Sequence, residues 1–303
     1  MLQSGRSALD LALYLLLPVL VIMMALMKLV EARGGLASVA RLFQPLLRLF
    51  GVPGAGAFAM LQLILVSFAA PLATLVVMER DGTCRRQIAA TLAMIFAMSQ
   101  ANVVFPMVAS GLNLWAILGT SLVGGLVAAA CTYYLFTRSI EDIPSEDHFS
   151  ATAENGRSSS LGLMITGGQE AVTVIINAIP ILVLSIFLVN LLKAVGAITV
   201  LETLLAPVFK TIGFPVEAVL PLATKYLAGG TAMMGVTLNL MKEGVITTTE
   251  LNRMAGFLTN PCDIVGVAVL IAAGSRSASV VRPAIAGAVV GILLRGVLHL
   301  LIF

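Results

Sequence analysis

Two short polar runs interrupt otherwise apolar stretches of this sequence, and they hold residue types that bind polar ligands. The first run is Ser99-Gln100-Ala101-Asn102, and the second is Thr259-Asn260-Pro261-Cys262-Asp263. Amides and hydroxyls donate and accept hydrogen bonds, and a carboxylate can bind a cation or a proton. Polar groups inside apolar spans are costly, so they point to function. We expect these residues in a binding site: Gln100, Asn102, Thr259, Asn260 and Asp263.

The two polar runs occupy matching places in the two halves of the chain. Phe96 and Phe257 align them at a shift of 161 residues. Each run has a proline, Pro106 or Pro261, which removes a backbone donor and is expected to break its helix. Matching breaks in two halves are typical of transporters with a binding site at the bilayer midplane, where helix ends and free carbonyls face the solute or ion.

A second pair of matching segments also combines polar residues with helix breakers. One contains Gln62 and Ser67, and its counterpart contains Lys225 and the run Gly229-Gly230-Thr231. Glycines allow helices or a ligand to approach closely. Lys225 and Asp263 are the ionisable residues expected deep in the second half, so we predict that they form an ion pair.

Other polar residues have simpler structural explanations. Ser67, Ser99 and Thr231 could serve only helix packing, as hydroxyls often do in membrane helices. Arg295 and His299, near the C-terminal end, are expected to extend toward the membrane surface. The chain has two histidines and no recognisable nucleophile beside a base, so we do not expect an enzyme.

The composition sets the environment in which these residues act. Of 303 residues, 59% are hydrophobic and 11% are charged, and the mean hydropathy is +1.04, whereas soluble domains average about 25% charged residues. We therefore expect an all-α integral membrane protein that does not bind nucleic acid. Eight apolar stretches approach the roughly 20 residues that span a bilayer: 11–30, 55–78, 88–108, 114–136, 172–192, 218–241, 251–273 and 284–303.

The two halves of the chain share a pattern of proline and glycine. A shift of 162 residues aligns 18–53 with 180–215, and five positions coincide: Pro18/Pro180, Gly34/Gly196, Pro45/Pro207, Gly51/Gly213 and Pro53/Pro215. Because Pro and Gly fix backbone geometry, the same bends are predicted in both copies. We expect two homologous repeats of about four spans, 1–136 and 166–303, joined by an exposed acidic and serine-rich linker at 137–165. Each repeat has a short amphipathic or re-entrant helix, at 36–50 and 198–212.

The topology depends on whether these short helices cross the membrane. If they do, nine lysines and arginines, including Arg80, Arg85 and Arg138, fall on one side. The positive-inside rule makes that side cytoplasmic. This count favours inverted repeats over parallel ones, with a cytoplasmic linker and a location in the cytoplasmic (inner) membrane.

Several of these motifs resemble a known family. The Gly-x-Pro that ends both short helices, the pair Gly229-Gly230 and the run Asn260-Pro261-Cys262-Asp263 resemble the nucleoside-recognition or Gate domain. Related domains occur in spore maturation proteins A and B, in the membrane part of ferrous iron transport protein B and in concentrative nucleoside transporters. The resemblance implies a transporter-like fold with Asn260 and Asp263 at a central site, and with the two glycines as a segment of close approach.

The leading hypothesis is a transporter or permease for a small polar solute, such as a nucleoside-like compound, surrounded by membrane lipid. Na+ or H+ is the expected coupling ion, at Asp263; no other cofactor is expected. By analogy with the family, a homodimer is an expected assembly. Two alternatives stay open. The chain could be a membrane assembly protein that moves no solute, or it could transport a transition metal through Cys262, Asp263 and Met233 or Met234, because sulfur ligands suit soft ions.

Overall fold

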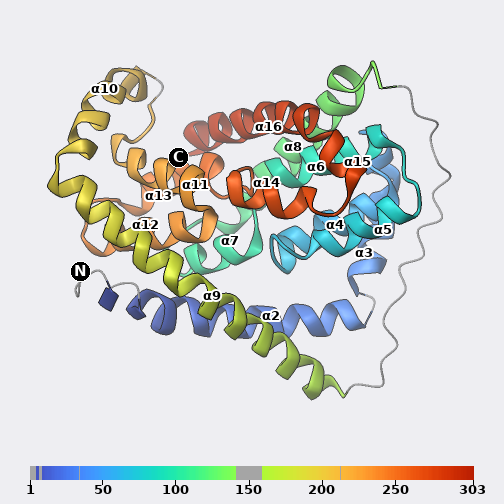
Figure 1. The fold of residues 1–303 in the computed structure, drawn as a ribbon, viewed down its shortest axis with the longest axis horizontal. Helices are drawn as coiled ribbons and strands as arrows, with labels where there is room; N and C mark the ends of the chain where they lie inside the picture. The colour runs from blue at the N-terminus through green and yellow to red at the C-terminus, as the bar shows by residue number, and fades with distance from the viewer. Residues whose placement is uncertain (1–4, 7–8, 34, 141–158, 212) are drawn as a thin grey trace.

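The computed structural model describes residues 5–6, 9–33, 35–140, 159–211 and 213–303, and every element in these ranges is helical, as predicted (Figure 1). The N-terminal part contains η1 (Leu11–Leu16), α2 (Leu17–Ala32), α3 (Gly35–Arg48), α4 (Gly54–Leu65), α5 (Pro71–Arg80), α6 (Arg85–Ala97), α7 (Ala101–Val108), α8 (Leu114–Cys131) and η2 (Thr132–Phe136). The C-terminal part contains α9 (Ser160–Ala194), α10 (Ala197–Thr211), η3 (Val216–Ala218), α11 (Val219–Ala228), α12 (Gly230–Lys242), α13 (Thr248–Leu258), α14 (Ile264–Ile271), α15 (Ser275–Ser279) and α16 (Val281–Ile302). Most of the expected linker, 137–165, lies outside the described residues.

Apart from the short elements η1, η2, η3 and α15, both parts of the chain contain the same kinds of helix in the same order. A long helix (α2 or α9) precedes a short one (α3 or α10), then two pairs of short helices and a final long helix (α8 or α16). The short helices expected at 36–50 and 198–212 correspond to α3 and α10. Both are followed by a glycine with positive φ, Gly51 at 77° and Gly213 at 67°, a conformation that glycine adopts readily. The common origin of the two parts stays a prediction.

Two of the eight apolar stretches fold back on themselves instead of forming one continuous span. In the first, the Thr74 hydroxyl donates to Oε1 of Gln62 at 2.7 Å, although 12 residues of straight helix would separate them by roughly 18 Å. Helices α4 and α5 therefore form a hairpin with its tip at 66–70. Helices α11 and α12 also pack against each other, and they are joined at Gly229, which has φ +87°. We call these pairs the first and second hairpin.

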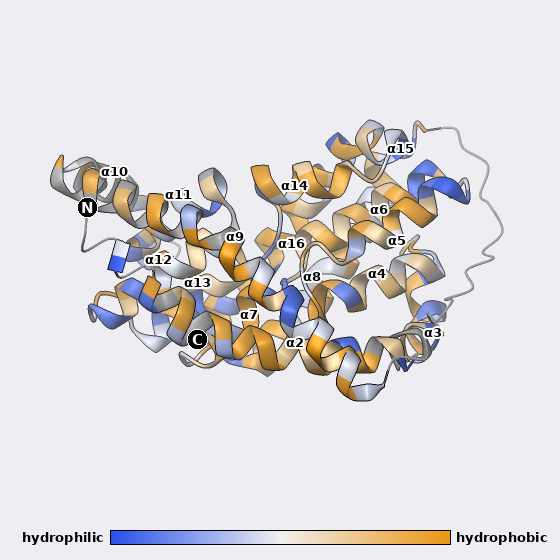
Figure 2. Cartoon of the chain, turned by 60° about the horizontal axis from the view of Figure 1, so that its bottom comes forward, coloured by the Kyte–Doolittle hydropathy of each residue, from blue (hydrophilic) through white to orange (hydrophobic). Residues whose placement is uncertain are grey.

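Three helical segments among the described residues are long and apolar enough to cross a membrane: Arg85–Val108, Leu114–Phe136 and Val281–Ile302. Figure 2 shows hydrophobic residues along much of α2, α9 and α14, and outward-facing ones include Ile22, Leu184 and Ile264. A helix that is apolar on its outer face suits lipid. The protein is thus a multi-pass membrane protein.

Helices α8 and α16 approach closely through small residues. A Cβ atom added to Gly291 of α16 would lie 2.4 Å from the carbonyl oxygen of Gly124 in α8, and 2.9 Å from the Cβ of Ala128. Lipid provides no hydrophobic drive for helices to associate, so membrane helices gain stability from this kind of close packing. Helices α8 and α16 are therefore packed tightly against each other.

The buried apolar side chains of the described residues form two clusters, and each cluster combines both parts of the chain. The first cluster contains α7 with α9 and α11 to α13, including Val103, Met107 and Met233. The second contains α3 to α6 with α14 and α16, including Leu63 and Leu270. The chain passes from one cluster to the other several times. Two of these crossings, between α6 and α7 and between α13 and α14, are at the predicted polar runs.

Candidate functional site

The two helix breaks, at 98–100 and 259–263, lie against each other. The main-chain N–H of Gln100 donates to the carbonyl of Thr259 at 3.0 Å, and the hydroxyls of Ser99 and Thr259 are 2.9 Å apart. The side-chain amide of Gln100 also donates to the carbonyl of Asn260 at 3.4 Å. Non-helical main chain inside a membrane protein needs such partners, because lipid offers none. Each break therefore stabilises the other.

The first break is not caused by Pro106, contrary to the prediction. Pro106 lies inside α7, and the chain leaves the helical conformation earlier, at Met98, with φ −84° and ψ 163°. The N–H of Ser99 donates to the hydroxyl of Ser121 at 2.6 Å instead of continuing helix α6. Tertiary partners, rather than proline, thus hold this break open. In the second break, Pro261 does lie in the non-helical segment.

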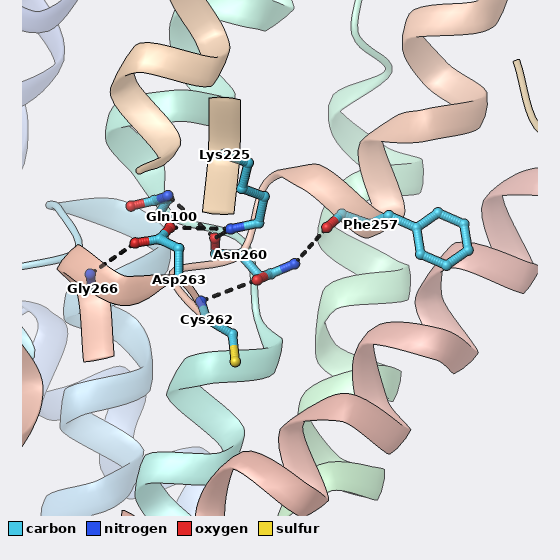
Figure 3. A network of polar contacts seen from close by, with 7 residues as sticks. All are labelled: Gln100, Lys225, Phe257, Asn260, Cys262, Asp263 and Gly266. Carbon is cyan, nitrogen blue, oxygen red and sulfur yellow. Dashed lines mark hydrogen bonds and ion pairs between the residues drawn. The ribbon is translucent and has the colours of Figure 1, made fainter. Parts of the chain in front are cut away.

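Asn260 shapes the second break through its side chain (Figure 3). Its Oδ1 accepts the N–H of Cys262 at 3.0 Å, and its Nδ2 donates to the carbonyl of Phe257 at 2.8 Å. The amide therefore bridges the end of α13 and the loop before α14. Its carbonyl oxygen points to the other side and accepts bonds from Gln100 and Lys225.

The predicted ion pair between Lys225 and Asp263 is confirmed. Nζ of Lys225 lies 3.1 Å from Oδ2 of Asp263, and the two side chains are 0% and 2% exposed. The other carboxylate oxygen accepts the N–H of Gly266 at 2.8 Å, so Asp263 caps the first turn of α14. A carboxylate is stabilised at the positive end of a helix. Lys225 comes from the second hairpin, which is thereby held to the break (Figure 3).

Arg295 was expected near the membrane surface, and this prediction was wrong. Its side chain is fully buried, and the guanidinium donates to the carbonyl of Ala97, to the hydroxyl of Ser99 at 2.5 Å and to that of Thr259 at 2.9 Å. It therefore binds the C-terminal ends of both α6 and α13, where the helix dipoles favour a positive charge. These acceptors hold the Arg295 side chain in the protein interior, although two of them, Ala97 and Ser99, are 198 and 196 residues away in the sequence.

His299 is also fully buried, although the sequence suggested the surface. One ring nitrogen lies 2.6 Å from the carbonyl of Asn252 and the other 2.9 Å from the hydroxyl of Thr120. These partners belong to α13 and α8, so His299 ties α16 to both neighbours. The sequence signal that could have found both residues is their spacing of four on one face of an apolar helix.

Both hairpin tips reach the start of α7. A Cβ atom on Gly230, in the second hairpin, would lie 2.1 Å from Nε2 of Gln100, so any larger residue would displace this side-chain amide. In the first hairpin, the N–H of Phe68 donates to Oδ1 of Asn102 at 3.3 Å. Two predicted residues, Gln100 and Asn102, therefore each contact one hairpin tip.

The structure brings most of the predicted site residues together. One group surrounds the second break: Gln100, Lys225, Gly229, Gly230, Thr259, Asn260 and Asp263. Ser67 is half-buried at the tip of the first hairpin, Gln62 is buried lower in that hairpin, and Thr231 is half-buried in the first turn of α12. Among the described residues, no three His, Cys, Asp or Glu side chains are grouped as metal ligands. Cys262 and Asp263 are adjacent, but the carboxylate is engaged by Lys225.

No family model matches, so the assignment to the Gate domain is not confirmed. Spore maturation protein B of Bacillus subtilis (strain 168) is 35% identical over 77 residues, which make up 25% of this chain and 43% of that protein. The match thus spans less than half of the relative's length.

Solved structures of CNTnw, a concentrative nucleoside transporter, resemble the whole fold. An outward-facing form with two substitutions has a TM-score of 0.70 at 16% identity, and covers 94% of this chain and 74% of its own. The inward-facing substrate-bound state has a TM-score of 0.69 at 18% identity, with 94% and 73% covered. The similarity is one of fold. The predicted all-helical membrane fold is therefore confirmed, and its division into two repeats stays a prediction.

Proposed function

We propose that this chain is a transporter of a small polar solute, bound where the two helix breaks and the two hairpin tips meet. The observation that carries the proposal is the position of Gln100 and Asn102. Both residues lie where the chain passes from α6, in the second cluster, to α7, in the first. Gln100 contacts the second hairpin, and Asn102 contacts the first. A solute bound there would contact parts of the molecule that belong to both clusters, which is what coupling of binding to a rocking motion needs.

The chemistry of the site favours a solute that forms hydrogen bonds. Its side chains are amides, hydroxyls and one ion pair, which recognise hydroxyl, amide and carbonyl groups. The fold of CNTnw supports a nucleoside-like compound as the first class to test. Coupling to Na+ or H+ would involve Asp263, the buried carboxylate. The cytoplasmic membrane is the proposed location, and a homodimer is the proposed assembly.

The test begins with binding and then measures transport. A ligand of the native state raises the unfolding temperature, so the purified protein is screened against nucleosides, nucleobases, amino acids and organic acids. Any hit is then followed as labelled uptake into proteoliposomes. Replacing Gln100 with alanine should weaken binding about tenfold, the worth of one hydrogen bond, and should lower uptake.

Gln169 provides the matched control for this substitution. It is exposed on α9, so Gln169→Ala should leave binding and uptake unchanged. Uptake that is equal in wild type, Gln100→Ala and empty liposomes would refute the proposal.

A second candidate function is membrane assembly, which the match to spore maturation protein B favours. In that case the polar breaks would organise the fold for a protein partner. This function predicts a specific protein that co-purifies with the chain, and no ligand in the screen. Loss of that partner in Gln100→Ala, without any solute flux in wild type, would support assembly over transport.

A further inference from the structure

The ammonium group of Lys225 is bound by two oxygen atoms at the second break. Its Nζ lies 2.6 Å from the carbonyl oxygen of Asn260 and 3.1 Å from Oδ2 of Asp263, and the side chain has no exposed surface. The carbonyl belongs to the non-helical segment between α13 and α14. Carbonyls of unwound helices are the groups that coordinate coupling cations in transporters. The ammonium therefore lies where such a cation would bind.

The charges around Asp263 are already matched. One carboxylate oxygen accepts the N–H of Gly266 at the start of α14, where the helix dipole is positive. The other is paired with Lys225. A sodium ion added here would bring another positive charge beside the ammonium and the helix end, with one carboxylate to balance all of them. Like charges repel strongly when they are buried, so the ammonium and sodium exclude each other.

We propose that Lys225 is a built-in cation: its ammonium takes the place of sodium at Asp263, so the site assembles without sodium. The inference concerns the site of the proposed function, and it names the protein itself as the source of the charge. The same ion pair also holds the second hairpin in place. Among the described residues of that hairpin, Lys225 is the one whose charged group contacts the Asp263 carboxylate. Binding of a solute at this site is therefore expected to be independent of sodium, so that H+ is left as the coupling ion of the two named in the proposed function.

The experiment compares unfolding temperatures of the purified 303-residue chain in sodium chloride and in choline chloride at equal concentration. Wild type should unfold at the same temperature in both. Lys225→Ala leaves the carboxylate without its partner and opens space beside it, so this variant should unfold at a lower temperature in choline and recover in sodium. The double variant Lys225→Ala/Asp263→Asn should lose the response to sodium, because its carboxylate is gone.

Lys242 is the matched control. It is exposed in the last turn of α12, so Lys242→Ala should resemble wild type in both salts. A wild type that is stabilised by sodium, with the effect removed by Asp263→Asn, would overturn the inference. So would a folded Lys225→Ala variant that ignores sodium. If Lys225→Ala does not fold in either salt, the inference is judged on wild type and Asp263→Asn. Stabilisation of wild type by sodium that Asp263→Asn removes would overturn it, and equal unfolding temperatures of wild type in both salts would support it.

These measurements need no solute, so they separate this inference from the proposed function. A chain that shows the expected salt responses and no uptake would retain Lys225 as the built-in cation and reject transport. A chain that takes up solute only with sodium bound at Asp263 would retain transport and reject the built-in cation.

Discussion

Arg295 offers the most informative test of how the two breaks are held together. Replacing it with methionine keeps an unbranched apolar side chain in α16 and removes the guanidinium. The carbonyl of Ala97 then loses the donor that the structure gives it. A buried acceptor left unsatisfied costs about 1–3 kcal/mol.

The hydroxyls that Arg295 also binds have other partners. Ser99 and Thr259 remain 2.9 Å from each other, and the Thr259 hydroxyl also donates to the carbonyl of Ala255 at 2.9 Å. Removing the guanidinium therefore costs less free energy at these two hydroxyls than at the Ala97 carbonyl. The space left by the shorter side chain adds about 1 kcal/mol. We expect Arg295→Met to lower the free energy of unfolding by about 2–4 kcal/mol in total.

The measurement is a titration of the purified protein with a denaturing detergent, followed by the loss of helical signal. Arg282 is the matched control, because it lies in the first turn of the same helix and is exposed. Arg282→Met should change the free energy of unfolding by less than about 0.5 kcal/mol. If Arg295→Met were as stable as wild type, the cost of burying the guanidinium would equal what its bonds provide, and our account of Arg295 would be wrong.

Two further predictions concern helix packing. Gly291→Ala should destabilise the protein by about 1–3 kcal/mol, because the new methyl group would meet the main chain of α8; Gly119→Ala, where nothing lies within 4 Å, should be neutral or stabilise α8 by up to about 1 kcal/mol. Equal effects in detergent titrations of both variants would argue against the close packing of α8 and α16. Glu170→Gln breaks a half-exposed ion pair in which Lys28 lies 2.7 Å away, and it should cost less than about 1 kcal/mol; a measured loss above about 2 kcal/mol would show that this pair is better shielded than its exposure indicates.

The sequence predicted the features that depend on local composition. The polar runs at 99–102 and 259–263 could be read as breaks because amides, a carboxylate and proline are rare in apolar spans. The ion pair of Lys225 and Asp263 followed from the need to neutralise a buried charge. The breaks were predicted from the residue types within each run, and the ion pair needed in addition only one residue of opposite charge in the same half of the chain.

Features that depend on tertiary contacts escaped sequence reasoning. A hydropathy pattern does not distinguish one continuous helix from two short helices that fold back, so the hairpin that brings Thr74 to Gln62 was read as a single span. Arg295 was misplaced because its acceptors are up to 198 residues away along the chain. Pro106 was held responsible for a break that Ser121 stabilises from another helix. In each case the deciding partner lies in another helix, and the pattern of the segment itself does not reveal that contact.

The mixed composition of the two hydrophobic clusters has a consequence for how the protein is made. Ribosomes deliver the chain from its N-terminus, and α7 is complete long before α12 and α13, whose buried side chains share one cluster with Val103 and Met107. The other cluster likewise waits for α14 and α16, which supply Leu270 and Ile292. The first cluster cannot close until α13 has been synthesised, and the second cannot close until α16 has been. During most of translation, the first half of the protein therefore depends on lipid or on insertion machinery to cover surfaces that its own second half will later bury.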